Sequence, residues 1–325
     1  MKAMVYTQYG PPEVVRLQEI DIPMVKAGEV LIKIHATTVN RTDCGFRSAN
    51  YFIVRFFSGL FKPRAKILGC EFAGEIEAVG GDVSNFKPGD RVFGYDDTHF
   101  GGHGEYKVMA ASGALAMIPE GMNYIEAAPL TEGSHYALGN IRAAKVKKGD
   151  TVMVYGATGA IGSAAVQLLK HFGAYVVAVS NTKNVELVTS LGADEVIDYQ
   201  TQRFAETTHR FDFVFDAVGK CSFHLCKPLL KSKGIYISTE LGRNSENVWL
   251  ALFTPMGGGR KVLFPLPTIN QADVLMIRKL AGSGDFKPVI DRTYPLEQLV
   301  EAYQYVETGQ KTGNVVITLE NSDRL

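Results

Sequence analysis

The chain has 325 residues, 46% of them hydrophobic and 21% charged, which is enough for about two globular domains with their own cores. Its 34 basic and 34 acidic side chains give a formal net charge of zero, which excludes a general attraction to nucleic acid or to anionic membranes. The four cysteines form no C-x-x-C pair, so we expect neither a disulfide framework nor a structural zinc loop.

The first residues lead directly into a strand pattern, without the apolar segment of a signal peptide. No apolar run in the sequence is long enough to span a bilayer. We therefore expect a cytoplasmic protein that has neither a nucleic acid nor a membrane as its partner.

Residues 1–130 are predicted to form short strands separated by turns rich in glycine, proline and aspartate. Examples are the apolar runs at residues 29–34, 74–79 and 91–94, the last of which follows the turn at 87–90. This pattern favours a partly open β-barrel.

From residue 131 to 268 strands alternate with helices, which predicts a parallel sheet with right-handed crossovers. Beyond its first two strands, we expect further strands at residues 195–199, 211–218, 234–239 and 261–264. The return segment, residues 269–325, is predicted to contain helices at 271–280 and 296–306 and strands at 288–291 and 314–319.

Residues 151–180 have the pattern of a nucleotide-binding βαβ unit. A strand at 151–155 runs through a glycine-rich turn into a helix at 163–172, and a second strand follows at 175–179. The turn matches A-x-G-x-x-G, in which Gly159 lets the backbone approach a pyrophosphate and Gly162 lets the helix pack close to its strand. Between a strand and a helix, this motif indicates a dinucleotide site.

The end of the second strand lacks the acidic residue that accepts a hydrogen bond from the ribose of NAD. Ser180 stands at that position and is followed by Asn181 and Lys183. A carboxylate would repel a 2′-phosphate, whereas hydroxyl, amide and ammonium donors hold one. The sequence therefore favours NADPH, with a solvated loop lysine as the alternative interpretation of Lys183.

Several short motifs resemble those of the medium-chain dehydrogenase/reductase superfamily over nearly the full chain. Residues 69–76 resemble its G-H-E-x-x-G-x-V segment, 89–92 its G-D-R-V turn, and 191–194 its L-G-A-D helix exit. Residues 216–219 and 311–316 resemble its D-x-V-G loop and its C-terminal strand.

This resemblance implies an α/β protein of two domains with a cleft between them. A GroES-like, partly open β-barrel domain formed by residues 1–130 and 269–325 would hold the substrate, and a Rossmann domain with a doubly wound parallel sheet, residues 131–268, would hold the cofactor.

The residues at the zinc-ligand positions indicate which branch of the superfamily the chain resembles. Zinc alcohol dehydrogenases have Cys, His and Cys as catalytic ligands, and the matching residues here are Asn40, Cys70 and Leu130. Asparagine and leucine are not zinc ligands, so no metal is expected and Cys70 is interpreted as a small core residue. His99 and His103 are interpreted as surface histidines. The chain thus resembles the zinc-independent, quinone oxidoreductase-like branch.

Without a Lewis acid, reduction of a quinone or of an activated C=C bond is favoured over oxidation of a plain alcohol, because the incoming charge spreads onto a conjugated carbonyl oxygen. The expected substrate is a small quinone or enone. An enoyl-thioester reductase is an alternative, in which Arg55, Lys62, Arg64 and Lys66 would bind the phosphates of the thioester. A non-enzymatic, redox-responsive NADPH-binding protein is another.

The resemblance places candidate catalytic roles on Asn40, Tyr51 and Tyr136. Asn40 would donate to a developing oxyanion or cap the end of a strand, and Tyr51, or a water, would supply the proton. Asp43 is expected to cap the helix that follows it, and Arg47 to be a solvated helix charge or a substrate contact. The cofactor-binding candidates are Ser134, Ala157, Thr158, Gly159, Ala160, Ile161, Ser180, Asn181, Lys183, Tyr199, Ala217, Val218 and Asn314.

Residues 50–66 depart from the family pattern by an aromatic-rich insertion. It would either line a pocket for a bulky apolar substrate or pack over the barrel.

The last strand of the Rossmann domain is expected to form an isologous homodimer, with coverage of this edge within one chain as the alternative. Val262, Leu263 and Phe264 are too apolar for an exposed edge, Pro265 would end the pairing, and the nearby residues 249–253 would add apolar area.

Overall fold

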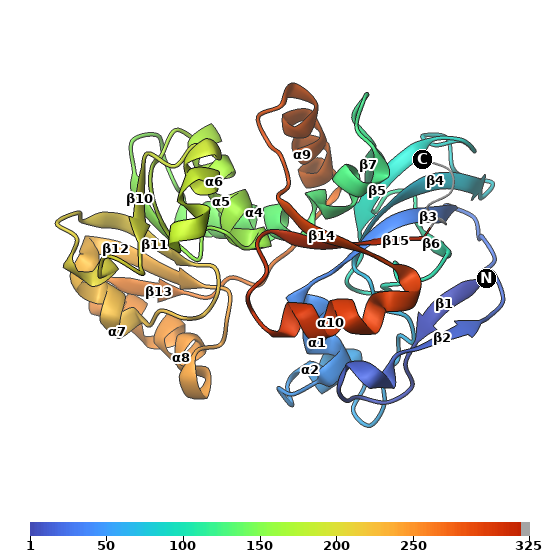
Figure 1. Cartoon of the computed structure of the whole chain (residues 1–325), viewed down its shortest axis with the longest axis horizontal. Coiled ribbons are helices and arrows are strands. Elements are labelled where there is room, and N and C mark those ends of the chain that lie inside the picture. The colour runs from blue at the N-terminus through green and yellow to red at the C-terminus, as the bar shows by residue number, and fades with distance from the viewer. Residues whose placement is uncertain (320–325) are drawn as a thin grey trace. The chain divides into compact units, whose positions relative to one another are not determined.

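The computed structural model describes residues 1–319 of the chain, which divide into two compact units (Figure 1). The barrel unit contains residues 1–132 and 269–284 and the described chain from residue 288 onward. The Rossmann unit contains residues 133–268 and 285–287. Among residues 1–319, no helix combines the length and the apolar character needed to cross a bilayer.

A seven-stranded sheet forms the barrel unit, in the order β14-β15-β3-β4-β5-β7, with β6 paired to the other part of β3. The long strand β3, Glu29–Val39, is its centre because it pairs antiparallel with β4, β6 and β15. Its side chains alternate between core and surface, and Val30, Ile32 and Ile34 pack in a core with Phe72 and Ile76 of β4. The other strands are β4 Glu71–Val79, β5 Arg91–Tyr95, β6 Tyr106–Ala110, β7 Ala114–Met117, β14 Ile290–Pro295 and β15 Asn314–Thr318.

The remaining elements of the barrel unit surround this sheet. A separate two-stranded sheet pairs β1, Lys2–Val5, with β2, Arg16–Glu19. The helices are α1 Arg41–Ser48, α2 Val54–Ser58, α3 Tyr124–Ala127, α9 Gln271–Ser283 and α10 Leu299–Glu307. The architecture is that of the predicted GroES-like barrel.

The sequence predicts Arg47 to be either a solvated helix charge or a substrate contact, and the structure shows neither. Arg47 is fully buried, where its guanidinium donates to the Gly10 carbonyl at 2.6 Å, forms an ion pair with Glu307 of α10, and lies 5.0 Å from the centre of the Tyr303 ring. A buried guanidinium needs such partners. Arg47 therefore joins α1 to α10, which is 260 residues away in the sequence.

The Rossmann unit contains a six-stranded, all-parallel sheet in the order β10-β9-β8-β11-β12-β13. The strand order reverses at β8, so successive right-handed crossovers place α5 and α6 on one side of the sheet and α7 and α8 on the other (Figure 1). The doubly wound fold is thus confirmed. The strands are β8 Thr151–Tyr155, β9 Tyr175–Ser180, β10 Glu195–Asp198, β11 Phe211–Asp216, β12 Leu230–Ser238 and β13 Lys261–Leu263.

The helices of this unit follow the same alternation. They are α4 Glu132–Ala144, which begins in the barrel unit, α5 Ala160–His171, α6 Val185–Ser190, α7 Phe223–Cys226 and α8 Glu246–Phe253. Helix α5 starts at Ala160, three residues before the predicted start, because Gly159 already has the extended conformation of an N-cap.

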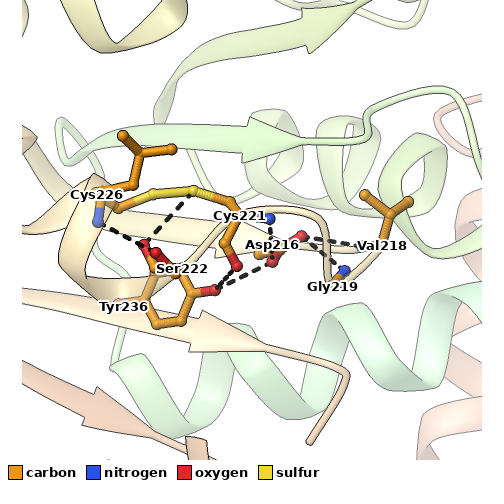
Figure 2. Close-up of a disulfide and its surroundings, with 8 residues drawn as sticks. Asp216, Val218, Gly219, Cys221, Ser222, Cys226 and Tyr236 are labelled. Carbon is orange, nitrogen blue, oxygen red and sulfur yellow. Dashed lines mark hydrogen bonds between the residues drawn. A yellow bond between two sulfur atoms is a disulfide. The ribbon is translucent and has the colours of Figure 1, made fainter. Parts of the chain in front are cut away.

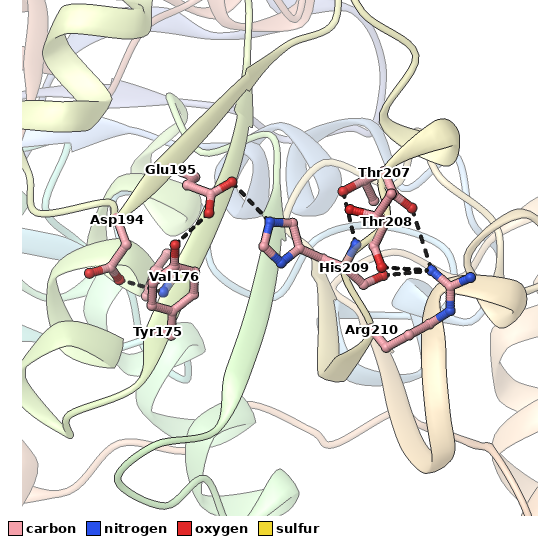
Figure 3. Close-up of polar contacts among 8 residues, drawn as sticks. All are labelled: Tyr175, Val176, Asp194, Glu195, Thr207, Thr208, His209 and Arg210. Carbon is pink, nitrogen blue, oxygen red and sulfur yellow. Dashed lines mark hydrogen bonds and ion pairs between the residues drawn. The ribbon is translucent and has the colours of Figure 1, made fainter.

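Side-chain contacts fix the amino-terminal ends of β9 and β10 (Figure 3). Glu195 accepts hydrogen bonds from the Tyr175 hydroxyl and, at 2.9 Å, interacts with Nε2 of His209. Asp194 accepts from the backbone N–H of Val176 at 2.7 Å. The turn between β8 and α5 lies at the opposite, carboxyl-terminal ends of these parallel strands.

The expectation of no disulfide is wrong, since Cys221 and Cys226 are bonded to one another (Figure 2). The turn after β11 and helix α7 bring these two residues together although they form no C-x-x-C motif. The carboxylate of Asp216 holds the same turn by accepting from the backbone N–H groups of Gly219, at 2.9 Å, and Cys221, at 3.1 Å.

The outer edge of β13 pairs with no other strand among residues 1–319. Val262 is buried in the core of the unit, whereas Leu263 is partly exposed. Helix α8 packs against β13 and exposes Trp249 and Phe253 by more than half, but Leu250, expected to share that surface, packs against the core instead. We propose that a second copy of the chain covers this edge.

Replacing Leu263 with lysine is expected to convert a dimer to a monomer, because two lysines would meet across the two-fold axis without counter-charges. Light scattering at micromolar concentration measures the mass. Thr189→Lys, on exposed α6, is the control and should leave the mass unchanged. A monomeric mass for the unaltered chain would refute the proposal.

Candidate functional site

A buried carboxylate, Glu71, is the centre of a polar network in the barrel unit. Its Oε1 accepts hydrogen bonds from the hydroxyl of Thr38, at 2.7 Å, and from Nδ2 of Asn40, at 2.9 Å. Its Oε2 accepts from the backbone N–H of Glu132, at 2.7 Å, and from the backbone N–H and hydroxyl of Thr131, at 3.1 and 2.9 Å. Glu71 is fully buried, and these donors are what make a buried carboxylate tolerable.

Asn40 connects this carboxylate to the start of α1. Its amide donates to Glu71 and, at 2.8 Å, to the Thr38 hydroxyl, so both of its amide hydrogens have acceptors. The residue is also the N-cap of α1, and Asp43 accepts from its backbone N–H at 2.9 Å. Its role as an oxyanion donor stays a prediction that this geometry does not favour, because a substrate oxygen would have to displace Glu71 or Thr38.

Asp43 does cap α1, but from inside the helix rather than from in front of it. Its Oδ2 accepts from Asn40 N, three residues earlier, and its Oδ1 accepts from Gly69 N at 3.0 Å. This is the reciprocal arrangement of a capping box, with a carboxylate in the first turn.

Glu132, the first residue of α4, faces the same network and was not singled out from the sequence. The hydroxyl of Thr42 donates to its Oε1 at 2.5 Å, and the Cys70 thiol lies 3.5 Å from its Oε2. Burial, followed by the negative charge of nearby Glu71, raises the pKa of Glu132 to about 8. Burial raises the pKa of Glu71 as well, against the lowering effect of its hydrogen bonds. With a pKa of about 8, Glu132 holds a proton at neutral pH.

His103 is buried, which corrects its interpretation as a surface histidine. Its Nε2 lies 2.8 Å from the Thr38 carbonyl oxygen, and its ring meets that of Tyr303 edge to face. Burial lowers the pKa of His103, so the neutral ring supports the end of β3. His99, in contrast, is exposed beside Asp96.

The turn between β8 and α5 has the geometry required of a dinucleotide loop. A Cβ atom on Gly162 would lie 2.1 Å from the Gly156 carbonyl oxygen, so only glycine fits there. A Cβ on Gly159 would meet nothing closer than 3.9 Å, so on the outer side of the turn the backbone is open. Helix α5 has no side-chain cap, which leaves the first N–H groups, including those of Ala160 and Ile161, for an anion.

The other cofactor candidates of the Rossmann unit gather at the same edge. Ser180 ends β9 and pairs in register with Asp198 of β10, and the N–H of Tyr199 donates to the Ser180 carbonyl at 3.0 Å. Lys183 is exposed and has no ion pair within residues 1–319. Asp198, which the sequence analysis did not single out, lies at the same edge. Its carboxylate accepts hydrogen bonds from the Thr182 hydroxyl at 2.6 Å and from the backbone N–H of Gln200 at 3.0 Å.

Ala217 and Val218 follow β11 at the adjacent strand end. The N–H of Ala217 donates to the Tyr155 carbonyl at 3.0 Å, which ties this turn to β8. A Cβ on Gly156 would lie 2.5 Å from the Val218 side chain, so the two turns are in contact. Thus Ala157, Thr158, Ser180 and Val218 belong to one edge, at the point where the strand order reverses.

The other predicted site residues have the following positions. Tyr51 is 54% exposed, just before α2. Ser134 is buried and Tyr136 half-buried in α4. Asn314 begins β15, where its amide donates to the Val289 carbonyl at 2.9 Å rather than pointing outward.

The three positions that resemble zinc ligands are close to the network but carry no ligand set. Asn40 donates to Glu71, Leu130 is a fully buried apolar residue, and burial raises the pKa of the Cys70 thiol. Throughout residues 1–319, no group of three or more His, Cys, Asp or Glu side chains is arranged to hold a metal ion.

Comparisons with known proteins agree with this architecture. Residues 26–121 match the alcohol dehydrogenase GroES-like domain, and residues 191–317 match the family described as zinc-binding dehydrogenase. A 2-methylene-furan-3-one reductase of Solanum lycopersicum is 33% identical, and the match covers 98% of this chain and 79% of the relative. An NADPH-dependent alkenal/one oxidoreductase, chloroplastic, of Arabidopsis thaliana is 30% identical with the same coverage.

Among solved structures, a quinone oxidoreductase from Coxiella burnetii superposes with a TM-score of 0.87 at 27% identity, covering 98% of this chain and 99% of that one. The chain belongs to the medium-chain dehydrogenase/reductase superfamily, in its quinone oxidoreductase-like branch. It is therefore a member of a family of oxidoreductases.

The raised pKa of Glu132 predicts a pH dependence of stability. The unfolded side chain ionises near pH 4.5 and the folded one near pH 8, so the folded protein binds the extra proton between these values. The contribution is fully present below the lower pKa and is lost as the pH rises to about 8. Relative to Glu132→Gln, the unaltered chain should lose stability over this range.

Urea midpoints measured at several pH values test this directly. Glu120→Gln, at an exposed position, is the control. A constant difference between the Glu132→Gln variant and the unaltered chain from pH 5 to pH 8 would show that Glu132 is not protonated.

Proposed function

We propose that the chain is a zinc-independent, NADPH-dependent reductase that transfers hydride to a quinone or to the activated C=C bond of an α,β-unsaturated carbonyl compound. The proposal rests on two features of the same chain. It has a glycine-rich dinucleotide loop, and Asn40 and Leu130 stand at two of the positions where zinc alcohol dehydrogenases have metal ligands. The printed names of the relatives, an enone reductase and a quinone oxidoreductase among them, support the substrate class.

The loop fits the dinucleotide. Gly159 and the uncapped start of α5 would receive the pyrophosphate, and Ala217 and Val218 would border the nucleotide at the adjacent strand end. Ser180, Asn181 and Lys183 would hold the 2′-phosphate. Asp198 keeps its negative charge while it accepts from Thr182 and Gln200, so the ammonium of Lys183 would have to offset that charge at the 2′-phosphate.

When bound, the dihydronicotinamide supplies a hydride to the β-carbon of the substrate. The electron pair of the C=C bond then forms an enolate, which takes a proton at the α-carbon. A water or the exposed hydroxyl of Tyr51 would deliver that proton. The network around Glu71 would keep β3, α1 and α4 in place, and no metal would be needed because conjugation spreads the negative charge.

A turnover assay against a panel tests the proposal. Loss of dihydronicotinamide absorbance should follow addition of a simple enone or a quinone. Faster turnover of a crotonyl thioester would favour the enoyl-thioester reductase, and nucleotide binding without turnover of any compound would favour a non-enzymatic role. The cytoplasmic location expected from the sequence remains a prediction.

NADPH is expected to bind at least about tenfold more tightly than NADH, a difference of about 1.4 kcal/mol. Lys183→Ala should weaken NADPH about tenfold and leave NADH unchanged, because only the 2′-phosphate meets this side chain. Lys148→Ala, at the opposite end of β8, is the matched control. Calorimetric titration giving equal affinities for the two nucleotides would contradict the assignment.

Protein treated with a chelator should keep its full reductase rate, because no residue at the three metal positions except Cys70 offers zinc a ligand. Elemental analysis should find zinc far below one atom per chain. One tightly bound zinc per chain would overturn the branch assignment.

A further inference from the structure

The insertion at residues 50–66, here called the aromatic segment, exposes a dense group of apolar side chains. Phe57 is 73% exposed and Phe61 is 89% exposed. The other exposed large apolar residues of the segment are Tyr51, Phe52, Ile53, Phe56 and Leu60. Single exposed apolar residues are ordinary, but a contiguous group of this kind marks an interaction surface.

The aromatic segment is held in place by the barrel unit. The hydroxyl of Tyr9 contacts the Ser58 hydroxyl at 2.7 Å and donates to the Gly59 carbonyl at 2.6 Å, and the guanidinium of Arg55 lies 5.1 Å from the centre of the Tyr9 ring. Beyond α2, the N–H of Arg64 donates to the Ser58 carbonyl at 2.8 Å. The exposed rings are therefore displayed on an ordered base.

The turn that closes this base requires a glycine. Gly59 has a φ of 125°, and a Cβ atom there would lie 2.1 Å from the Lys62 carbonyl oxygen. This turn presents Leu60 and Phe61 at the tip of the segment. Because this surface is already ordered, it loses less conformational entropy when it binds a partner.

The charge of the segment has one sign. Arg55, Lys62, Arg64 and Lys66 are its cations, and residues 50–66 contain no Asp or Glu. None of the four has a carboxylate partner within residues 1–319. The chain as a whole is neutral, but charges act on a surface only within a Debye length of about 8 Å, so the local excess decides what this face attracts.

We propose that the aromatic segment docks on the surface of an anionic phospholipid bilayer. Aromatic rings suit the boundary between headgroups and acyl chains, and lysine and arginine around them suit anionic headgroups. Helix α2 has five residues, so the segment lies on the membrane and does not span it. This departs from the expectation, based on net charge, that no membrane is a partner.

Other occupants explain the segment less completely. Two copies meeting through this face would bring four cations against four, without any acid between them. A phosphate-bearing ligand or a nucleic acid would bind the four cations. It would leave the exposed side chains of Leu60, Phe57 and Phe61 in contact with water.

Flotation with lipid vesicles tests the proposal, using pure phosphatidylcholine against phosphatidylcholine mixed with phosphatidylglycerol. The unaltered chain should bind the anionic vesicles at least about tenfold more tightly than the neutral ones, and salt should weaken the binding. The double variant Phe57→Ser/Phe61→Ser should lose at least about tenfold. The control Met24→Ser/Leu275→Ser removes two exposed apolar side chains elsewhere in the barrel unit and should bind normally.

A second readout follows the depth of insertion. Trp249 is the one tryptophan of the chain, so Phe61→Trp in a Trp249→Phe background reports on the tip alone. Its emission should shift to the blue with anionic vesicles only. Failure of the unaltered chain to float, or equal loss in the control variant, would overturn the proposal.

Two further results would overturn the membrane proposal, because each would show that a different partner binds the aromatic segment. One is a change in molecular mass caused by Phe57→Ser/Phe61→Ser in the absence of vesicles. The other is tighter binding of a single-stranded RNA than of anionic vesicles.

Discussion

The barrel unit depends on one buried carboxylate. Glu71 opens β4, and the five donors it accepts come from the end of β3, from the residue that caps α1, and from the start of α4. An unpaired buried donor costs about 1–3 kcal/mol, so loss of this acceptor would leave several costly groups together. A single side chain thus joins the strand end, the start of the first helix and residues 131–132 within the barrel unit.

This arrangement has an electrostatic consequence. Burial, followed by the negative charge of Glu71, makes ionisation of the neighbouring Glu132 unfavourable. A protonated Glu132 can then accept from Thr42 without a second negative charge in the same cavity. The carboxyl groups beside Asn40 are then those of Glu71 and Asp43, each of which accepts hydrogen bonds from at least two donors.

The features that could be predicted from the sequence are mostly those determined by residues close to one another in the chain. The turn from Gly156 to Gly162 is recognisable from a few adjacent residues, because Gly162 is required by its contact with Gly156 within the turn itself. The strands and the parallel sheet followed from periodicity and from the alternation with helices, and the doubly wound order was implied by the family resemblance. Capping of α1 was expected, and only the position of Asp43 within the cap differed.

Features that depend on distant partners were missed. Arg47 is buried because Glu307 meets it from the far end of the chain, and His103 is buried because β3 and α10 cover it. Neither residue has a local signal that separates it from a surface charge. The disulfide between Cys221 and Cys226 was missed for a similar reason, since the turn held by Asp216 brings together two cysteines that lack a recognised spacing.

The central claim is that the chain moves a hydride to an activated carbon without a metal. It is tested most directly by NADPH carrying deuterium at the transferred position of the nicotinamide, with a simple enone and chelator-treated protein. Mass spectrometry of the product should find one deuterium, on the β-carbon of the saturated ketone. A product without deuterium, or no product until zinc is added, would contradict the account.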